Sequence, residues 1–259
     1  MTSYNDNKAP ADIKAMFIQR RGYWRPWTQT LLEEHPAFLE AYARYASYPA
    51  SAGPLDARMV ELIYVALDAS ATHLFEAGVQ THLELARQAG ATTGDVLDVL
   101  HLVALQGVNR VYEAIAILES ELGQGASFER GATSRDAELP EALRREVERH
   151  FPGSAEELGA LARFDAEYLR QVMAFMDVSA PGSRLVEKEK RLVEAALHSS
   201  FTGFDEKALR RSIRAAVRAD ATADEIAQAI QLGSHLSVHG TALGVKCLGA
   251  DKNNRTHAT

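Results

Sequence analysis

The chain has 259 residues, of which 46% are hydrophobic, and a formal net charge of −7. This length allows a sizeable buried core, in one large domain or two small ones. The acidic balance argues against nucleic-acid binding, because the phosphate backbone is bound mainly by clustered Lys and Arg. Cys247 is the only cysteine, which excludes an intramolecular disulfide and a Cys-Cys redox pair.

The start of the chain and its hydropathy indicate where the protein resides. Residues 1–14 are polar and lack the apolar core of a secretory signal. No apolar run approaches the roughly 18 residues needed to span a bilayer. We therefore expect a cytoplasmic protein that does not bind membranes. Two short basic clusters, Arg20-Arg21 and Arg210-Arg211, lie near acidic residues and are interpreted as solvated helix faces.

Apolar residues recur at helical spacing along almost the whole chain. The pattern predicts helices over residues 55–70, 76–89 and 94 to about 122. Alternating β-branched runs with Asn-Gly or Asp-Gly turns are missing, which argues against a sheet. The predicted fold class is all-α.

Residues at the predicted helix ends support these boundaries. Gly90 is expected to stop the second helix, and Thr92 with Asp95 is expected to cap the start of the third. Thr222 and Glu225 form a similar pair before a later helix.

One half of the sequence matches the other without gaps. Leu55, Leu62, Thr92 and Val108 match Leu185, Leu192, Thr222 and Val238, each at an offset of 130 residues. A constant offset that also preserves a capping position indicates an internal duplication. A Gly/Ser-rich, charged stretch separates the copies. The predicted parts are an N-terminal extension (1–22), a first unit (23–122), a linker (123–139), a second, degenerate unit (140–250) and a tail (251–259).

The helix predicted over residues 55–70 is apolar on most of its circumference. Glu61, Tyr64 and Asp68 are the exceptions, and they fall on one narrow strip. A polar strip on a buried helix requires partners or a wet cavity. The alternative is a strip that faces solvent or pairs with an arginine.

Two histidines lie near this strip in the sequence. His82 falls on the apolar face of the helix over 76–89, and His73 lies in the turn before it. His82 is either a hydrogen-bonded core residue or, with Glu61 and His73, part of a set suited to proton transfer near neutral pH. A metal site is disfavoured, because the histidines lack the i, i+4 spacing of helical zinc ligands and no third histidine or cysteine accompanies them. We expect no metal and no other cofactor.

These residues resemble the carboxymuconolactone decarboxylase family, which shares its fold with alkylhydroperoxidase D. The resemblance rests on the run from Glu61 to His73, on Gly78-x3-His82, on Ala89-Gly-Ala-Thr92 and on the Gly107-Val-Asn109 turn. It covers roughly residues 23–250 and implies two tandem copies of the helical unit. The first copy matches well and the second weakly.

The redox branch of this family uses Cys-x-x-Cys with a histidine four residues on. Aligned on His82, the cysteine positions hold Phe75 and Gly78. A thiol peroxidase needs a thiolate nucleophile, so this activity ranks last. Cys247, at the end of the second copy, is expected to be a small buried hydrophobe.

The decarboxylase branch uses general acids and bases instead. The resemblance implies catalytic roles for His82, with Glu61 as its acidic partner, and for His73. Neighbouring polar groups expected to bind substrate are Tyr64, Asp68, Thr72, Asn109 and Tyr112. The subgroup usually has Gly-x-His at the Gly107 turn, and Asn109 departs from that pattern.

The second copy has lost the catalytic pattern. The positions equivalent to Glu61, His73 and His82 are Arg191, Gly203 and Ser212. The copy is either a scaffold, or it contributes Arg191 and His239 to bind an anionic substrate.

The sequence therefore indicates a cofactor-free acid–base lyase for a small carboxylated or oxo-lactone compound. The alternative is a catalytically silent oligomeric binding or scaffold protein of the same fold. Single-copy relatives form rings of six units, so the resemblance implies a homotrimer, or alternatively a dimer.

Overall fold

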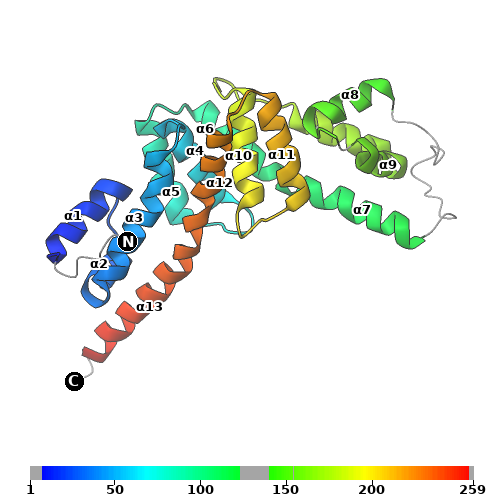
Figure 1. Ribbon diagram of the computed structural model, residues 1–259. Helices are drawn as coiled ribbons and strands as arrows, with labels where there is room; N and C mark the ends of the chain where they lie inside the picture. Colours follow the sequence, from blue (N-terminus) through cyan, green and yellow to red (C-terminus); the bar gives the residue numbers. More distant parts are fainter. Residues whose placement is uncertain (1–7, 123–139, 154, 257–259) are drawn as a thin grey trace.

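The computed structural model describes residues 8–122, 140–153 and 155–256, and all regular elements in these ranges are helices (Figure 1). The all-α prediction is therefore confirmed. The linker predicted over 123–139 lies outside the described residues. None of the described helices is both long and apolar enough to cross a membrane.

The first half contains α1 (Pro10–Arg21), α2 (Pro26–Glu34), α3 (Pro36–Ala52), α4 (Ala57–Ala69), α5 (Glu76–Gln88), α6 (Thr93–Ala104), the 3-10 turn η1 (Leu105–Gly107) and α7 (Val108–Leu122). The second half contains α8 (Glu141–His150), α9 (Ala155–Met176), α10 (Glu187–Ser199), α11 (Glu206–Arg218), α12 (Ala223–Leu232), the 3-10 turn η3 (Gly233–Ser237) and α13 (Val238–Thr256). The helix α13 thus includes most of the segment predicted as a tail.

Helix boundaries repeat at the offset seen in the sequence. Both ends of α4 and α5 recur 130 residues later as the ends of α10 and α11, and α6 and α7 begin 130 residues before α12 and α13. The correspondence extends to the opening helices: α9 is kinked at Asp165 (φ −155°, ψ 90°), where the first half separates α2 from α3 at His35 (φ −151°, ψ 63°). The two tandem copies therefore share an architecture, α1 to α7 and α8 to α13.

The copies exchange their last helices. A central bundle of α4, α5, α6, α10, α11 and α12 surrounds the main core (Figure 1). At one end, α13 packs on α2, and its Val238 and Ala242 join the core of α1 to α3. At the other end, α7 packs on α9, and Tyr112 joins the core of α8 and α9. Each copy's opening helices are therefore covered by the other copy's final helix.

Local capping follows the predictions. Thr92 Oγ1 accepts from Asp95 N–H at 3.0 Å while Asp95 accepts from Thr92 N–H, and Thr222 forms the same box with Glu225. Gly90 adopts a left-handed φ of 91° after α5, which favours glycine.

The single helix predicted from 94 to 122 is wrong, because η1 divides it into α6 and α7. Leu105 is buried in the central core, whereas Tyr112 belongs to the core of the opposite end. The chain must turn between them, and helical periodicity on both sides conceals the break.

Two buried polar side chains tie the copies together at equivalent positions. Asp98 accepts from Ala180 N–H at 2.6 Å. The residue 130 positions later, Gln228, accepts from Leu55 N–H and donates to the Pro49 carbonyl, both at 2.7 Å. Each satisfies backbone groups of the segment leading into the other copy's first central helix.

Replacing Gln228 with alanine is expected to lower the free energy of unfolding by about 2–4 kcal/mol, because two backbone groups at a buried site lose their partner. Urea denaturation would measure the change. Gln231→Ala, at an exposed position of the same helix, should leave stability within about 0.5 kcal/mol of the parent. Equal effects of the two substitutions would contradict this account.

Candidate active site

The polar strip of α4 is enclosed rather than solvated. Asp56 caps the helix by accepting from Met59 N–H at 2.7 Å, and α4 packs against α5, α6 and α10. Tyr64 and Asp68 are each only 1% exposed, so the alternative of a strip facing solvent is wrong for them. Glu61 is partly buried.

Glu61 and His82 meet across α4 and α5. His82 Nδ1 lies 2.6 Å from Glu61 Oε2, and the imidazole packs 4.6 Å from the Tyr64 ring. A carboxylate at Nδ1 fixes the ring's orientation and favours a proton on that nitrogen. His82 Nε2 is left on the side of Asp68, with 3.8 Å to Asp68 Oδ2.

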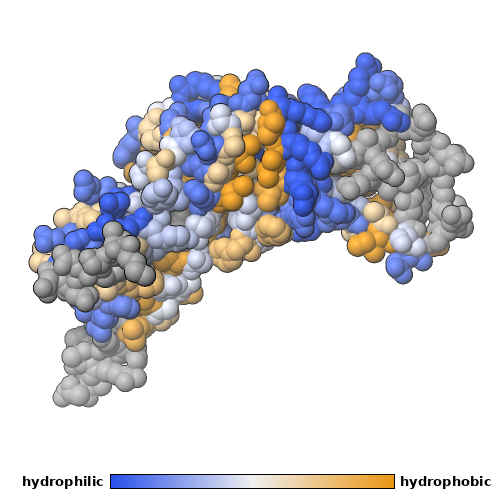
Figure 2. Space-filling view, in the orientation of Figure 1, coloured by the Kyte–Doolittle hydropathy of each residue, from blue (hydrophilic) through white to orange (hydrophobic). Residues whose placement is uncertain are grey.

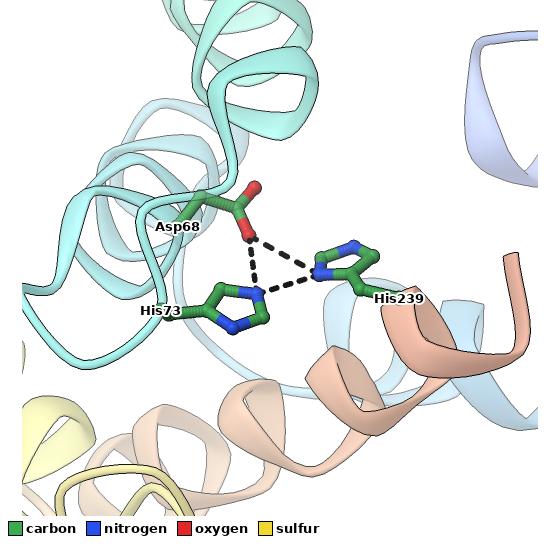
Figure 3. Close-up of side chains that lie close together, drawn as sticks. All are labelled: Asp68, His73 and His239. Carbon is green, nitrogen blue, oxygen red and sulfur yellow. Dashed lines mark hydrogen bonds and ion pairs between the residues drawn. The ribbon is translucent and has the colours of Figure 1, made fainter. Parts of the chain in front are cut away.

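His73 and His239 complete this cluster from the two copies. His73 Nε2 lies 2.7 Å from His239 Nδ1, and each of these atoms lies 3.7 Å from Asp68 Oδ1 (Figure 3). The Phe75 ring stacks on His239 with centroids 3.9 Å apart. His239 reaches the first copy because α13 crosses over to it.

Burial controls the charge of this cluster. It raises the pKa of Asp68 to about 8, helped by the negative charge of Glu61 and opposed by Arg21. Burial also lowers the pKa of His73, and with the neighbouring His73 and His82 it lowers the pKa of His239 to about 3. The two stacked imidazoles are therefore neutral at pH 7.

Two arginines that sequence reasoning left out lie beside the strip. Arg21 is buried, with its guanidinium 5.8 Å from the Tyr64 ring centroid and a 3.2 Å bond to the Ala46 carbonyl. Arg25 donates to the Ala77 carbonyl at 3.0 Å and to Thr81. The interpretation of Arg21 as part of a solvated face is wrong, because an aromatic ring and a carbonyl replace its water.

Some predicted site residues lie elsewhere. Thr72 is exposed in the turn after α4 and hydrogen-bonds Ser70 Oγ at 3.0 Å. Asn109, Tyr112 and Arg191 lie with the second copy, on or beside a cavity of about 30 Å³. Of the residues predicted outside the first copy's motif, only His239 joins His82.

The second cavity has a different charge pattern. Arg191 is paired with Glu194 at 2.9 Å and with Glu187 at 2.6 Å. Asn109 accepts from Arg211 Nη2 at 2.6 Å. Arg211 is buried over aromatic rings, so its interpretation as part of a solvated face is also wrong. A buried arginine with two glutamates stabilises itself without any ligand.

Cys247 is exposed on α13, so the prediction that it is buried is wrong. Leu248 beside it is exposed as well, because the outer part of α13 extends beyond the helices it covers (Figure 1). No thiol lies in the cluster around His82.

The molecule is thus an all-helical tandem protein with an enclosed carboxylate–imidazole site. Residues 36–120 match the model of the carboxymuconolactone decarboxylase family. A candidate γ-carboxymuconolactone decarboxylase subunit from Burkholderia xenovorans LB400 has a similar crystal structure, with a TM-score of 0.84 and 27% identity over 96% of this chain and 99% of that one. Comparison with curated proteins finds no match. Through residues 36–120 the chain belongs to the carboxymuconolactone decarboxylase family.

The second cavity predicts a measurable pH dependence of stability. Burial lowers the pKa of His198 to about 4, with Arg211 and Arg110 opposing protonation and Asp205 favouring it; Asn109 Nδ2 lies 3.5 Å away. The unfolded chain binds this proton near pH 6.5, so the folded state loses stability as pH falls from 6.5 towards 4.

Between pH 7 and 4.5 the parent should lose about 1–3 kcal/mol more stability than His198→Asn. Urea unfolding at both pH values would measure this difference. Parallel loss of stability in the two proteins would show that His198 protonates normally in the folded state.

Proposed function

We propose that the protein is a carbon–carbon lyase that decarboxylates a small carboxylated or oxo-lactone compound, with His82 as the proton donor. The short contact between His82 and Glu61 carries this proposal. An enclosed imidazole held by a carboxylate is suited to general acid–base catalysis near neutral pH. Family membership supports the reaction class, and the similarity to the Burkholderia protein supports the type of substrate.

The step that this pair serves can be written with its electrons. The bond between the substrate and its carboxylate breaks, carbon dioxide leaves, and the electron pair moves into the conjugated carbonyl to form a dienolate. The imidazolium of His82 then gives the Nε2 proton to carbon, and water restores that proton. Glu61 stabilises the imidazolium and holds its Nδ1–H.

Neighbouring groups fit the binding of such a substrate. Tyr64 and Asp68 border His82, and the Arg21 guanidinium lies beyond the Tyr64 ring. Buried positive charge would offset the carboxylate of an incoming substrate. The proposed binding group is therefore Tyr64, Asp68 and Arg21.

His82→Ala should lower kcat by about 10²–10⁴ while the protein stays folded, because a general acid contributes that much. Glu61→Gln should cost less, since the imidazole remains. Turnover of a panel of carboxylated lactones and β-keto acids, followed by carbon dioxide release, would measure both effects. His101→Ala is the matched control, because His101 is half-buried on α6 against Phe175.

The alternative is a silent scaffold of the same fold. Turnover that is equal in the parent, His82→Ala and His101→Ala proteins would reject the proposed role of His82. An absence of turnover across the panel in the parent would favour the scaffold.

We also propose that the protein is a homotrimer. Ile117, Leu118 and Leu122 expose apolar surface at the outer end of α7, where Figure 2 shows hydrophobic residues gathered. Leu243 and Leu248 do the same on α13, the equivalent helix. Contiguous exposed apolar surface on a protein in water usually marks an interface.

Light scattering after size exclusion should give a mass of about 85 kDa, three times the 28.3 kDa chain. Leu118→Asp with Leu248→Asp should lower that mass, because charges are costly at a buried interface. Val178→Asp, exposed outside α7 and α13, is the control. A parent protein of about 28 kDa would refute the assembly.

A further inference from the structure

Three potential metal-ligand atoms converge where the two copies meet. Asp68 lies at the end of α4, His73 in the following turn and His239 near the start of α13 (Figure 3). Asp68 Oδ1, His73 Nε2 and His239 Nδ1 all lie within 4.8 Å of one another. The three side chains approach from separate backbone segments and point to a common centre.

The spacing of these atoms fits one small ion. The two nitrogens are 2.7 Å apart, and each is 3.7 Å from the carboxylate oxygen. The point equidistant from the three atoms lies about 2.0 Å from each, which is the usual distance from zinc to imidazole nitrogen or carboxylate oxygen. A shift of the ion out of their plane lengthens all three bonds together and keeps them within the range for a divalent transition metal.

The carboxylate has an unfilled requirement at this centre. Asp68 Oδ1 is buried and accepts no hydrogen bond from the described residues. A buried oxygen without a partner is costly, and a cation satisfies it fully. The other oxygen, Oδ2, is closely packed, since a Cβ added to Gly78 would lie 2.1 Å from it. The absence of a side chain at Gly78 thus makes room for the carboxylate at the centre.

We propose that Asp68, His73 and His239 bind one divalent transition-metal ion per chain. Two imidazoles and one carboxylate suit zinc, iron(II) or cobalt(II) better than magnesium or calcium, which prefer oxygen ligands. Three protein ligands leave coordination positions open to water or to a substrate oxygen. This proposal departs from the sequence analysis, which expected no metal because His239 is 166 residues from His73.

The second copy supplies an internal comparison. The positions equivalent to Asp68, His73 and His239 hold His198, Gly203 and Asn109. This set offers one imidazole and no carboxylate, so it lacks the ligands for a comparable site. The expected stoichiometry is therefore one ion per chain rather than two.

The ion's use in catalysis rests on the proposed function. An ion at this centre would lie beside Asp68, whose other oxygen is 3.8 Å from His82 Nε2. A substrate carbonyl bound to the ion would receive the electron pair released by decarboxylation, while His82 supplies the proton. The metal would thus provide the electron sink that the surrounding side chains do not.

Binding can be tested without any substrate. The full-length protein, with its affinity tag removed and dialysed against EDTA and then buffer, would be titrated with zinc and with cobalt(II). Calorimetry would give the stoichiometry, and the visible absorption of cobalt would report nitrogen and oxygen ligands. Asp68→Asn, His73→Asn and His239→Asn would each be compared with His198→Asn, which removes an imidazole from the second cavity.

We expect one equivalent of zinc in the parent and in His198→Asn, with binding weakened at least roughly 100-fold in the three ligand variants; changes outside the ligand set alone cost 10–100-fold. Zinc should also raise the Tm of the parent and not that of folded ligand variants. If a variant fails to fold, the cobalt spectrum of the parent still decides whether imidazole and carboxylate ligands are present.

Absence of binding in the parent, or equal binding in all the variants, would overturn the proposal. Decarboxylation that persists in EDTA-treated protein but is lost in His82→Ala would reject a catalytic ion and keep the proposed function. The two failures are therefore distinguishable.

Discussion

The exchange of final helices between the copies is the constraint on which the rest of the molecule depends. The opening helices of each copy expose apolar faces that only the other copy's last helix covers. Burial of such faces is the main driving force for folding, so neither copy has a complete hydrophobic core alone. The same exchange carries His239 to the first copy and Asn109 to the second. Both polar sites are therefore composite, and their chemistry is a property of the tandem chain.

Duplication has left two sites with the same positions buried and different charge. Glu61 and His82 form an acid–imidazole pair in the first copy. The equivalent positions hold Arg191 and Ser212, and Arg191 is neutralised by Glu187 and Glu194 on its own helix. The buried strip tolerates these exchanges because each set balances its own charge. An enclosed polar strip is thus a feature of the fold, and its reactivity depends on which residues occupy it.

Local features were predictable from the sequence and long-range ones were not. The ends of α4 to α6 followed from Gly90 and from the box of Thr92 with Asp95, which act within one turn. The contact between Glu61 and His82 followed from the polar strip and the family resemblance. The break at η1 did not, because it depends on where α7 packs. Arg21 was missed for the same reason, since its burial over Tyr64 requires α1 to fold back on the bundle.

The packing at Gly78 shows why this site and a thiol site exclude one another. A Cβ at this position would lie 2.1 Å from Asp68 Oδ2, so a cysteine there would displace the carboxylate. At the other cysteine position, Phe75 stacks on His239 and thereby supports an imidazole from the second copy. Loss of the thiols and gain of the Asp68–His239 arrangement are therefore one structural change rather than two. A chain of this fold can place sulfur or a buried carboxylate beside His82, and the volume available at residue 78 determines which.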